Sequence, residues 1–277
     1  MKAGIVAKGH AEDLDRYLEI ALRVLTSRGV EVFPEKDLEG RLPGIRAQYH
    51  RRELPFHVDF LIVLGGDGTL LSVADSSARA GVPILGINLG FLGFLTEIKK
   101  EEMEQVLLDY LEGKAFVEQR EMLEVSFRGQ AHLVLNDAVI NKSALARMIS
   151  VRVCVDGQEI STIRADGIIV STPTGSTGYN LSAGGPIINP MVSAIIITPI
   201  CPHALAQRPI VIPASSEVKV NLVSGEEVYL TLDGQRGEGM EEGDRVIIRR
   251  AEERLLLVRP EGRSYYQMLR EKLGWGS

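Results

Sequence analysis

The feature that most constrains this chain is a glycine-rich segment, residues 65–68, which reads Gly-Gly-Asp-Gly and joins two different apolar stretches. The preceding run, residues 59–64, is apolar after its first residue and does not alternate, which is typical of a parallel strand covered on both faces. The following residues, 70–80, read as a helix. A strand, a sharp glycine turn and a helix predict one βα unit of a parallel sheet.

The chemistry of this loop depends on its bare backbone and on Asp67. Exposed N–H groups beside the positive end of a helix can bind phosphate oxygens. A carboxylate repels phosphate, so Asp67 points to a metal or to a proton-transfer task. The alternative is a plain βα turn with a solvated aspartate. The residues predicted to form a phosphate-donor loop are Gly65, Gly66, Gly68 and Thr69.

The first 90 residues alternate between predicted strands and helices. Apolar side chains recur with helical spacing over residues 12–28, and Gly29 follows as a stop signal. Residues 34–57 are charged and weakly periodic, so we expect a partly irregular connection there. The alternation predicts a parallel sheet with a ligand crevice at the carboxyl ends of its strands, where Asp67 falls. The predicted strands are residues 3–7, 30–33, 59–64 and 84–88.

The second half of the chain has a different pattern. After one short predicted helix at 99–111, strands separated by turn signals follow from about residue 116. Asp156-Gly157 suits a two-residue type I′ hairpin turn. A second, mostly antiparallel domain is therefore expected. The predicted strands are residues 151–155, 158–163, 218–222, 228–232, 245–249 and 255–258, and the predicted last helix is 265–273.

These patterns predict an α/β plus all-β fold. A parallel α/β domain spans residues 1–97 and carries the Gly-Gly-Asp-Gly loop. A mostly antiparallel domain spans 98–255, and the tail, 256–277, packs back on the first domain as a helix.

Composition excludes several classes of function. The net charge of −6 and the scarcity of aromatic residues argue against nucleic-acid binding. No apolar run approaches the length of a membrane span or a signal peptide, so we expect a cytoplasmic protein without membrane partners. Cys154 and Cys201 are far apart, so neither a disulfide nor a zinc site is indicated, and both are predicted to be small core residues.

A second dense stretch covers residues 164–179. It combines an arginine, an aspartate, five hydroxyl side chains around Pro173, two loop glycines and Tyr179. Hydroxyls and bare N–H groups suit a ligand rich in hydroxyl and phosphate oxygens. The alternative is a Ser/Thr-rich turn that caps a helix, with Thr177 as the N-cap.

Taken together, these stretches resemble the NAD kinase family. Its signatures are a Gly-Gly-Asp-Gly loop, an Asn-Glu/Asp pair and a Thr-Gly-Ser-Thr-Ala-Tyr segment, which stand here at 65–68, 136–137 and 174–179. The resemblance covers most of the chain, including residues 200–203 and 232–235. It implies a Rossmann-like N-terminal domain and a β-sandwich-like C-terminal domain.

The resemblance also implies an activity. Members of the family transfer the γ-phosphate of ATP, or in some members of polyphosphate, to the 2′-hydroxyl of the adenosine ribose of NAD. NADP is the product, a divalent cation such as Mg²⁺ is needed, and homodimers or homotetramers are common. Phosphoryl transfer requires alignment and charge neutralisation, which loops of N–H donors and magnesium supply.

The resemblance assigns roles to individual residues. Asp67 is the expected general base on the 2′-hydroxyl, beside Gly68. Asp137 stands where Glu is commoner and is one methylene shorter, and Gly178 replaces the usual Ala. Phe91 is a possible wall for the adenine, and His203 is expected to be a turn residue. The residues implied to bind NAD are Asp67, Gly68, Asn136, Asp137, Arg147, Arg164, Asp166, Thr174, Thr177, Gly178, Tyr179, Asn180, Leu181, Ser182 and Gln235.

Two other classes of function remain open from the residues alone. One is a lipid or sugar kinase with the same glycine loop, and the other is a non-catalytic NAD(P) sensor. A P-loop kinase is excluded because the chain has no Walker A pattern. The absence of GxGxxG after the first strand argues against a hydride-transferring dehydrogenase.

Overall fold

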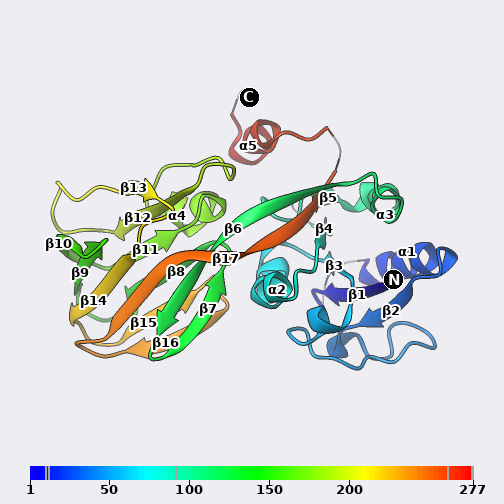
Figure 1. Cartoon of the computed structure of the whole chain (residues 1–277), viewed down its shortest axis with the longest axis horizontal. Helices are drawn as coiled ribbons and strands as arrows, with labels where there is room; N and C mark the ends of the chain where they lie inside the picture. The colour runs from blue at the N-terminus through cyan, green and yellow to red at the C-terminus, as the bar shows by residue number, and fades with distance from the viewer. Residues whose placement is uncertain (10, 12, 91–92, 261, 276–277) are drawn as a thin grey trace. The chain divides into compact units, whose positions relative to one another are not determined.

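The chain divides into two compact units. The computed structural model describes residues 1–9, 11, 13–90, 93–260 and 262–275. Unit 1 comprises Met1–Gln119 and Leu255–Ser277, and unit 2 comprises Arg120–Arg254. The chain enters unit 2 within strand β6 (Phe116–Phe127) and leaves it within strand β17 (Arg245–Arg259), as Figure 1 shows.

Unit 1 is built on a parallel sheet with the strand order β2-β1-β3-β4. Every residue of β3 and β4 is buried, which explains why the sequence does not alternate there. The end of β17 and the short strand β5 each pair with β4 in parallel. The bounds are β1 (Lys2–Ala7), β2 (Glu31–Pro34), β3 (Phe60–Leu64), β4 (Ile84–Asn88) and β5 (Ile98–Lys99).

The connections of this sheet create a switch point between β1 and β3. The chain leaves β1 for β2 through α1 (Leu14–Ser27) and leaves β3 for β4 through α2 (Asp67–Ala80), so the strand order reverses between them. The Lys8 N–H donates to the Leu64 carbonyl at 2.9 Å and ties the two strand ends together. Ligands of doubly wound sheets bind at such a point.

The remaining helices complete unit 1. Helix α3 (Met103–Leu111) buries Met103, Val106 and Leu107 in the core of β1, β3 and α1, which is why residues 98–119 group with this unit. Within the described residues, the irregular connection contains two 3₁₀ turns, η1 and η2, and an isolated bridge between Glu35 and Tyr49. The 3₁₀ turns of unit 1 are η1 (Lys36–Leu38), η2 (Leu54–His57) and η3 (Lys100–Glu102).

The C-terminal helix, α5 (Tyr265–Leu273), has the predicted bounds and belongs to unit 1. Ser264 caps it, because its hydroxyl accepts the N–H of Gln267 at 3.2 Å. The ammonium of Lys272 lies 5.6 Å from the centre of the Phe94 ring. The predicted return of the tail to the first domain is confirmed.

Unit 2 consists of two antiparallel sheets (Figure 1). Buried apolar side chains from both sheets form one core. One sheet has the order β10-β9-β14-β17, with β7 pairing β6, and the other has the order β13-β12-β11-β8-β15-β16. The bounds are β7 (Gln130–Val134), β8 (Asp137–Lys142), β9 (Ile149–Val155), β10 (Gln158–Ala165), β11 (Gly167–Ser171), β12 (Ala194–Ile200), β13 (Ile210–Pro213), β14 (Val218–Ser224), β15 (Val228–Leu232) and β16 (Arg236–Met240).

Two local predictions for unit 2 have different outcomes. Asp156 and Gly157 have φ values of 50° and 79°, as a type I′ turn requires, so the predicted hairpin is confirmed. Residues 245–249 and 255–258 are not separate strands but parts of the 15-residue strand β17, so that prediction is wrong. The polar run between them looks like a break in the sequence, yet its backbone stays extended and Ala251 is buried.

The predicted fold class, an α/β part, an antiparallel β part and a C-terminal helix, is confirmed. Within the described ranges, every helix is too short or too polar to cross a membrane.

Candidate functional site

The Gly-Gly-Asp-Gly loop lies at the switch point of unit 1. Helix α2 begins at Asp67, three residues earlier than predicted, with Gly66 at its N-cap. Close packing requires the first glycine, because a Cβ on Gly65 would lie 2.6 Å from the hydroxyl oxygen of Thr69. At Gly66 and Gly68 no described neighbouring atom lies within 4 Å of the Cβ position. The loop therefore leaves room for a ligand beside the positive end of a 14-residue helix.

The carboxylate of Asp67 is held by four hydrogen bonds from the segment that follows β4. Its Oδ2 accepts the N–H of Phe94 at 2.8 Å. Its Oδ1 accepts the N–H groups of Leu95 and Thr96 at 3.1 and 2.9 Å, and the hydroxyl of Thr96 at 2.9 Å. An ionised carboxylate offers about four lone-pair sites. These donors therefore occupy most of the accepting capacity of Asp67.

Two further residues fix this arrangement. The side-chain amide of Asn88, at the end of β4, donates to the Thr96 hydroxyl at 3.0 Å and so orients it toward Asp67. Gly93 permits the close approach, since a Cβ there would lie 1.9 Å from Asp67 Oδ1. The carboxylate is therefore positioned by a network that sequence reasoning missed, because its partners lie 27 to 29 residues away.

Lys8 is a second residue of the switch point that sequence reasoning missed. It directly follows β1, and its Cβ lies 3.3 Å from the Cβ position of Gly65. Its side chain is exposed. A cation next to open loop N–H groups suits a phosphate ligand. The sequence feature that could have identified Lys8 is its position directly after a predicted strand of a doubly wound sheet.

Unit 2 brings the predicted Asn-Asp pair into a cavity of about 240 Å³. Asn136 precedes β8 and Asp137 begins it, and Tyr179 comes from the short helix after the second motif. The side-chain oxygen of Asn136 is buried and has no hydrogen-bond partner among the described residues. The cavity is lined by Asn136, Asp137, Val139, Asn141, Tyr179, Thr231, Asp233 and Gly234.

Asp233, which follows β15, organises the wall of this cavity. Its Oδ2 accepts the N–H of Leu135 at 2.8 Å, and its Oδ1 accepts the N–H groups of Asn136 and Asp137 at 2.7 and 3.0 Å. In return, the Asp233 N–H donates to the carbonyl of Asp137 at 3.0 Å. One buried carboxylate therefore fixes three consecutive peptide groups.

Asp137 is in the opposite electrostatic situation. Its side chain is only 5% exposed, and the described ion pairs include none to it. Burial, together with the nearby charge of Asp233, raises the pKa of the Asp137 carboxyl from 3.8 to about 7. Desolvation is the larger cause, because a buried carboxylate loses the water that stabilises its charge.

The second motif folds into η4 (Thr174–Thr177) and α4 (Tyr179–Ser182). Gly178, not Thr177, occupies the N-cap of α4, so the predicted cap is wrong. Asn180 is fully buried, and its amide bonds to the carbonyls of Ser176 and Pro186 and to the hydroxyl of Thr198. Its described side-chain hydrogen bonds therefore anchor α4 to residue 186 and to β12.

A close backbone contact joins this segment to the Asn-Asp pair. A Cβ on Gly175 would lie 2.2 Å from the carbonyl oxygen of Asn136. By contrast, a Cβ on Gly178 would have its nearest contact at 3.3 Å, with the Gly175 carbonyl. Close packing therefore requires glycine at position 175, whereas position 178 accommodates a methyl group if the Gly175 carbonyl moves slightly.

The other predicted ligands lie outside the lining of the cavity. Asp166 follows β10, and its carboxylate is 3.7 Å from the ammonium of Lys142. Arg147, Arg164 and Gln235 are exposed in loops or at strand positions. The remaining predicted residues outside the lining are Thr174, Thr177, Gly178, Leu181 and Ser182. Phe91 falls outside the described residues.

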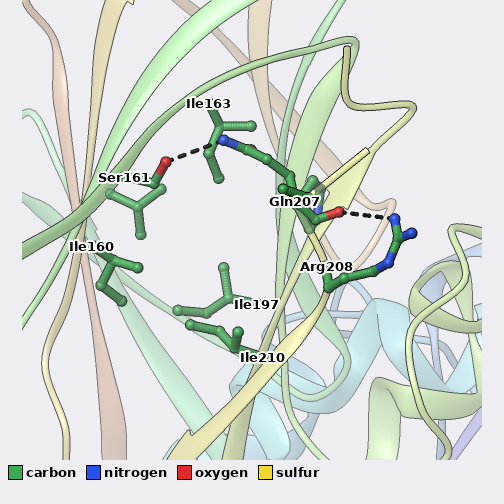
Figure 2. Close-up of a pocket in the computed structure, with 10 residues that line it drawn as sticks. Ile160, Ser161, Ile163, Ile197, Gln207, Arg208 and Ile210 are labelled. Carbon is green, nitrogen blue, oxygen red and sulfur yellow. Dashed lines mark hydrogen bonds between the residues drawn. The ribbon is translucent and has the colours of Figure 1, made fainter. Parts of the chain in front are cut away.

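An apolar cavity of about 330 Å³ lies elsewhere in unit 2 (Figure 2). It holds none of the predicted site residues. At its polar end the side-chain amide of Gln207 donates to the hydroxyl of Ser161 at 3.1 Å. Its labelled apolar walls are Ile160, Ile163, Ile197 and Ile210.

The cysteines differ from their prediction as core residues. Cys201 is exposed in the turn after β12 with a φ of 46°, and Cys154 is half-buried on β9. Alternation along β9 buries Val151 and Val153 instead. The neighbouring His203 is a turn residue whose backbone N–H donates to the carbonyl of Arg164 at 2.9 Å.

Comparisons with known proteins point to one family. Residues 3–115 match the ATP-NAD kinase N-terminal domain and residues 135–260 match the ATP-NAD kinase C-terminal domain. The chain is 47% identical over 281 residues to the NAD kinase of Geotalea daltonii, with 99% of each chain covered. It is 46% identical over 238 residues to that of Aquifex aeolicus, covering 82% of this chain and 87% of the relative.

Solved structures agree. The yeast NADH kinase complexed with NADH superimposes with a TM-score of 0.86 at 26% identity, covering 100% of this chain and 88% of that one. An NAD kinase from Archaeoglobus fulgidus in complex with ATP superimposes with a TM-score of 0.79 at 30% identity, covering 99% and 98%. The chain therefore belongs to the ATP-NAD kinase family.

Proposed function

We propose that this chain transfers the γ-phosphoryl group of ATP to the 2′-hydroxyl of the adenosine ribose of NAD and so makes NADP. The observation that carries the proposal is the position of Asp67, a held carboxylate at the first turn of α2 on a glycine loop open to a ligand. Relatives named NAD kinase match almost the whole chain. Structures of relatives with NADH and with ATP support nucleotide ligands.

The reaction divides tasks between residues. The 2′-hydroxyl oxygen bonds to the γ-phosphorus, the bond from that phosphorus to the bridging oxygen breaks, and ADP leaves. Asp67 accepts the hydroxyl proton as general base. Because four donors already hold its carboxylate, one of them must lengthen or shift when the hydroxyl arrives. The Thr96 hydroxyl is the donor that can rotate away without breaking a backbone hydrogen bond.

We assign binding of the phosphate donor to the loop residues Gly65, Gly66, Gly68 and Thr69, with Lys8 beside them. The dinucleotide contacts are assigned to Asn136, Asp137 and the other predicted residues of unit 2. Among the described residues no group of three or more carboxylate, histidine or cysteine side chains could hold a metal ion by itself. Mg²⁺ in nucleotide enzymes is commonly bound through the substrate phosphates, so we propose that it enters with ATP and neutralises phosphate charge there.

We further propose a cytoplasmic homodimer or homotetramer. Several large apolar side chains of unit 2 are exposed, and such residues are often covered in assemblies. Size-exclusion chromatography with light scattering measures the assembly, and a monomer at micromolar concentration would contradict it. The most exposed of these side chains are Leu145, Leu205 and Met191, at 99%, 85% and 74%.

One assay tests the activity. Purified protein is incubated with NAD, ATP and Mg²⁺, and NADP is measured with an NADP-specific dehydrogenase. We expect NADP to accumulate, and removal of the metal with EDTA to stop it. Binding of NAD without any NADP formation would overturn the proposal and favour a dinucleotide sensor. Absence of both binding and product would favour a kinase for another hydroxyl substrate.

A further inference from the structure

The proposed function assigns Asp137 to the dinucleotide but does not say in which protonation state it acts beside a second buried acid, Asp233. Both line the cavity of about 240 Å³, with exposed fractions of 5% and 9%. The second acid stands in a turn with a φ of 50°, and its N–H bonds to the carbonyl of the first. Two carboxylates so close together in a buried site do not both carry charge readily.

Hydrogen bonding decides which acid carries the charge. Asp233 accepts the N–H groups of residues 135–137 at 2.7 to 3.0 Å, and three such donors strongly stabilise an ionised carboxylate. No described hydrogen bond or ion pair provides the Asp137 carboxyl with a donor of this kind. The proton therefore resides on Asp137.

No other described residue of the cavity lining favours moving the proton from Asp137 to Asp233. Besides the two acids, the described lining holds one side chain with an acidic proton, Tyr179 from α4, and no lysine, arginine or histidine. Apart from Asp137, the lining residues from β8 and β15 are Val139, Asn141 and Thr231, which carry no charge. Burial and the charge of Asp233 raise the pKa of Asp137 to about 7, in agreement with the geometry.

We propose that Asp137 acts as a neutral carboxyl that donates a hydrogen bond to an acceptor oxygen of the ligand, and that Asp233 is the positioning residue that holds it. This inference rests on the proposed function, since the ligand in question is the dinucleotide. A ligand oxygen with free lone pairs, such as a ribose oxygen or a carboxamide carbonyl, satisfies such a donor. Ionisation of Asp137 removes the donor and places a negative charge against that oxygen.

Calorimetric titration of the full chain with NAD between pH 5.5 and 8.5 tests the donor. We expect the wild-type affinity to fall by about tenfold per pH unit above the pKa of Asp137. Asp137→Asn keeps an N–H donor of similar size but does not titrate, so its affinity should stay constant over the range. Equal affinity of the wild type at all pH values, or the same decline in Asp137→Asn, overturns the inference.

A ligand-free measurement separates this inference from the proposed function. In protein labelled with ¹³C at the aspartate carboxyls, the Asp137 resonance is identified by its loss in Asp137→Asn. We expect it to titrate near pH 7 and to titrate at lower pH in Asp233→Asn. An Asp137 carboxyl that stays ionised down to pH 5 overturns the inference even if NADP is formed. Titration near pH 7 in a protein that never binds NAD overturns the proposed function but leaves the neutral state of the Asp137 carboxyl established.

Discussion

Asp67 in unit 1 and Asp137 in unit 2 are the same type of side chain in two predicted sites, and their surroundings are opposite. Asp67 receives four hydrogen-bond donors. Asp137 lies beside the charged Asp233, and its pKa rises to about 7. The residue type alone therefore does not determine whether an aspartate carboxyl accepts or donates hydrogen bonds. The number of hydrogen-bond donors around the carboxyl decides its role. Four experiments can break or sharpen this comparison.

The largest effect is expected from Asp67→Asn. Loss of a general base typically slows a reaction by 10²–10⁴-fold, so we expect NADP formation to fall by about that factor. The affinity for NAD should change only a few-fold by calorimetry. Asp75→Asn, two turns along the same helix where the carboxylate forms an ion pair with Arg79, is the matched control and should keep the wild-type rate. A near-normal rate of Asp67→Asn would show that this carboxylate is purely structural.

The second effect is a pH dependence of stability that comes from Asp137. Its pKa is raised in the folded state, from 3.8 to about 7, so its contribution to the free energy of unfolding is complete below about pH 4 and is lost as the pH rises through 7. Relative to Asp137→Asn, the wild type should lose up to about 4 kcal/mol over this range. Urea unfolding at several pH values measures the difference. A difference that stays constant with pH would show that Asp137 is ionised in the folded protein.

A third test compares glycines that support the two acids. Gly93→Ala places a methyl group 1.9 Å from Asp67 Oδ1, and Gly175→Ala places one 2.2 Å from the Asn136 carbonyl. We expect the first to lower kcat and the second to raise the Kd for NAD, each with a stability loss of about 1–3 kcal/mol. Gly237→Ala, which meets no described atom within 4 Å, is the control. Identical effects of both variants on kcat and Kd would mean that the sites are not separable in this way.

The smallest effect is expected from Gly178→Ala, which adds one methyl group at the N-cap of α4. The new methyl group meets the Gly175 carbonyl at 3.3 Å, so the neighbour must give by only a few tenths of an ångström. Melting temperature and Kd for NAD should therefore stay close to those of the wild type. A large loss of NAD affinity would indicate that a ligand fills the space above this glycine.

The sequence was sufficient for features whose signals are local. The uninterrupted apolar runs predicted the buried strands of unit 1, and the Asp156-Gly157 pair predicted its hairpin turn. The end of α5 at Leu273 could be predicted because Gly274 follows it with a φ of 67°. Each of these depends on neighbours within a few residues in the chain.

The hydrogen bonds around Asp67 and Asp137 could not be predicted, because they join residues that are far apart in the sequence. Asp233 bonds peptide groups 96 to 98 residues away, and Thr96 reaches Asp67 over 29 residues. Nothing in a single sequence pairs a turn aspartate with N–H groups that far away. The predicted break in β17 failed because strand pairing outweighs the local polarity of residues 252–254. Long-range hydrogen bonding is therefore the part of the site that only the structure supplies.

The division of unit 1 into two chain segments has a consequence for biosynthesis. Leu257 and Val258 pair with Ile84 and Leu85 in β4, and Arg259 forms ion pairs with Glu97 and Glu118, so the last part of this unit is made long after the rest. At about 5–20 residues per second, a ribosome needs roughly 10–35 seconds to make the intervening chain. Meanwhile the edge of β4 is open to other strands. We expect the nascent protein to need shielding at that edge until its final residues emerge.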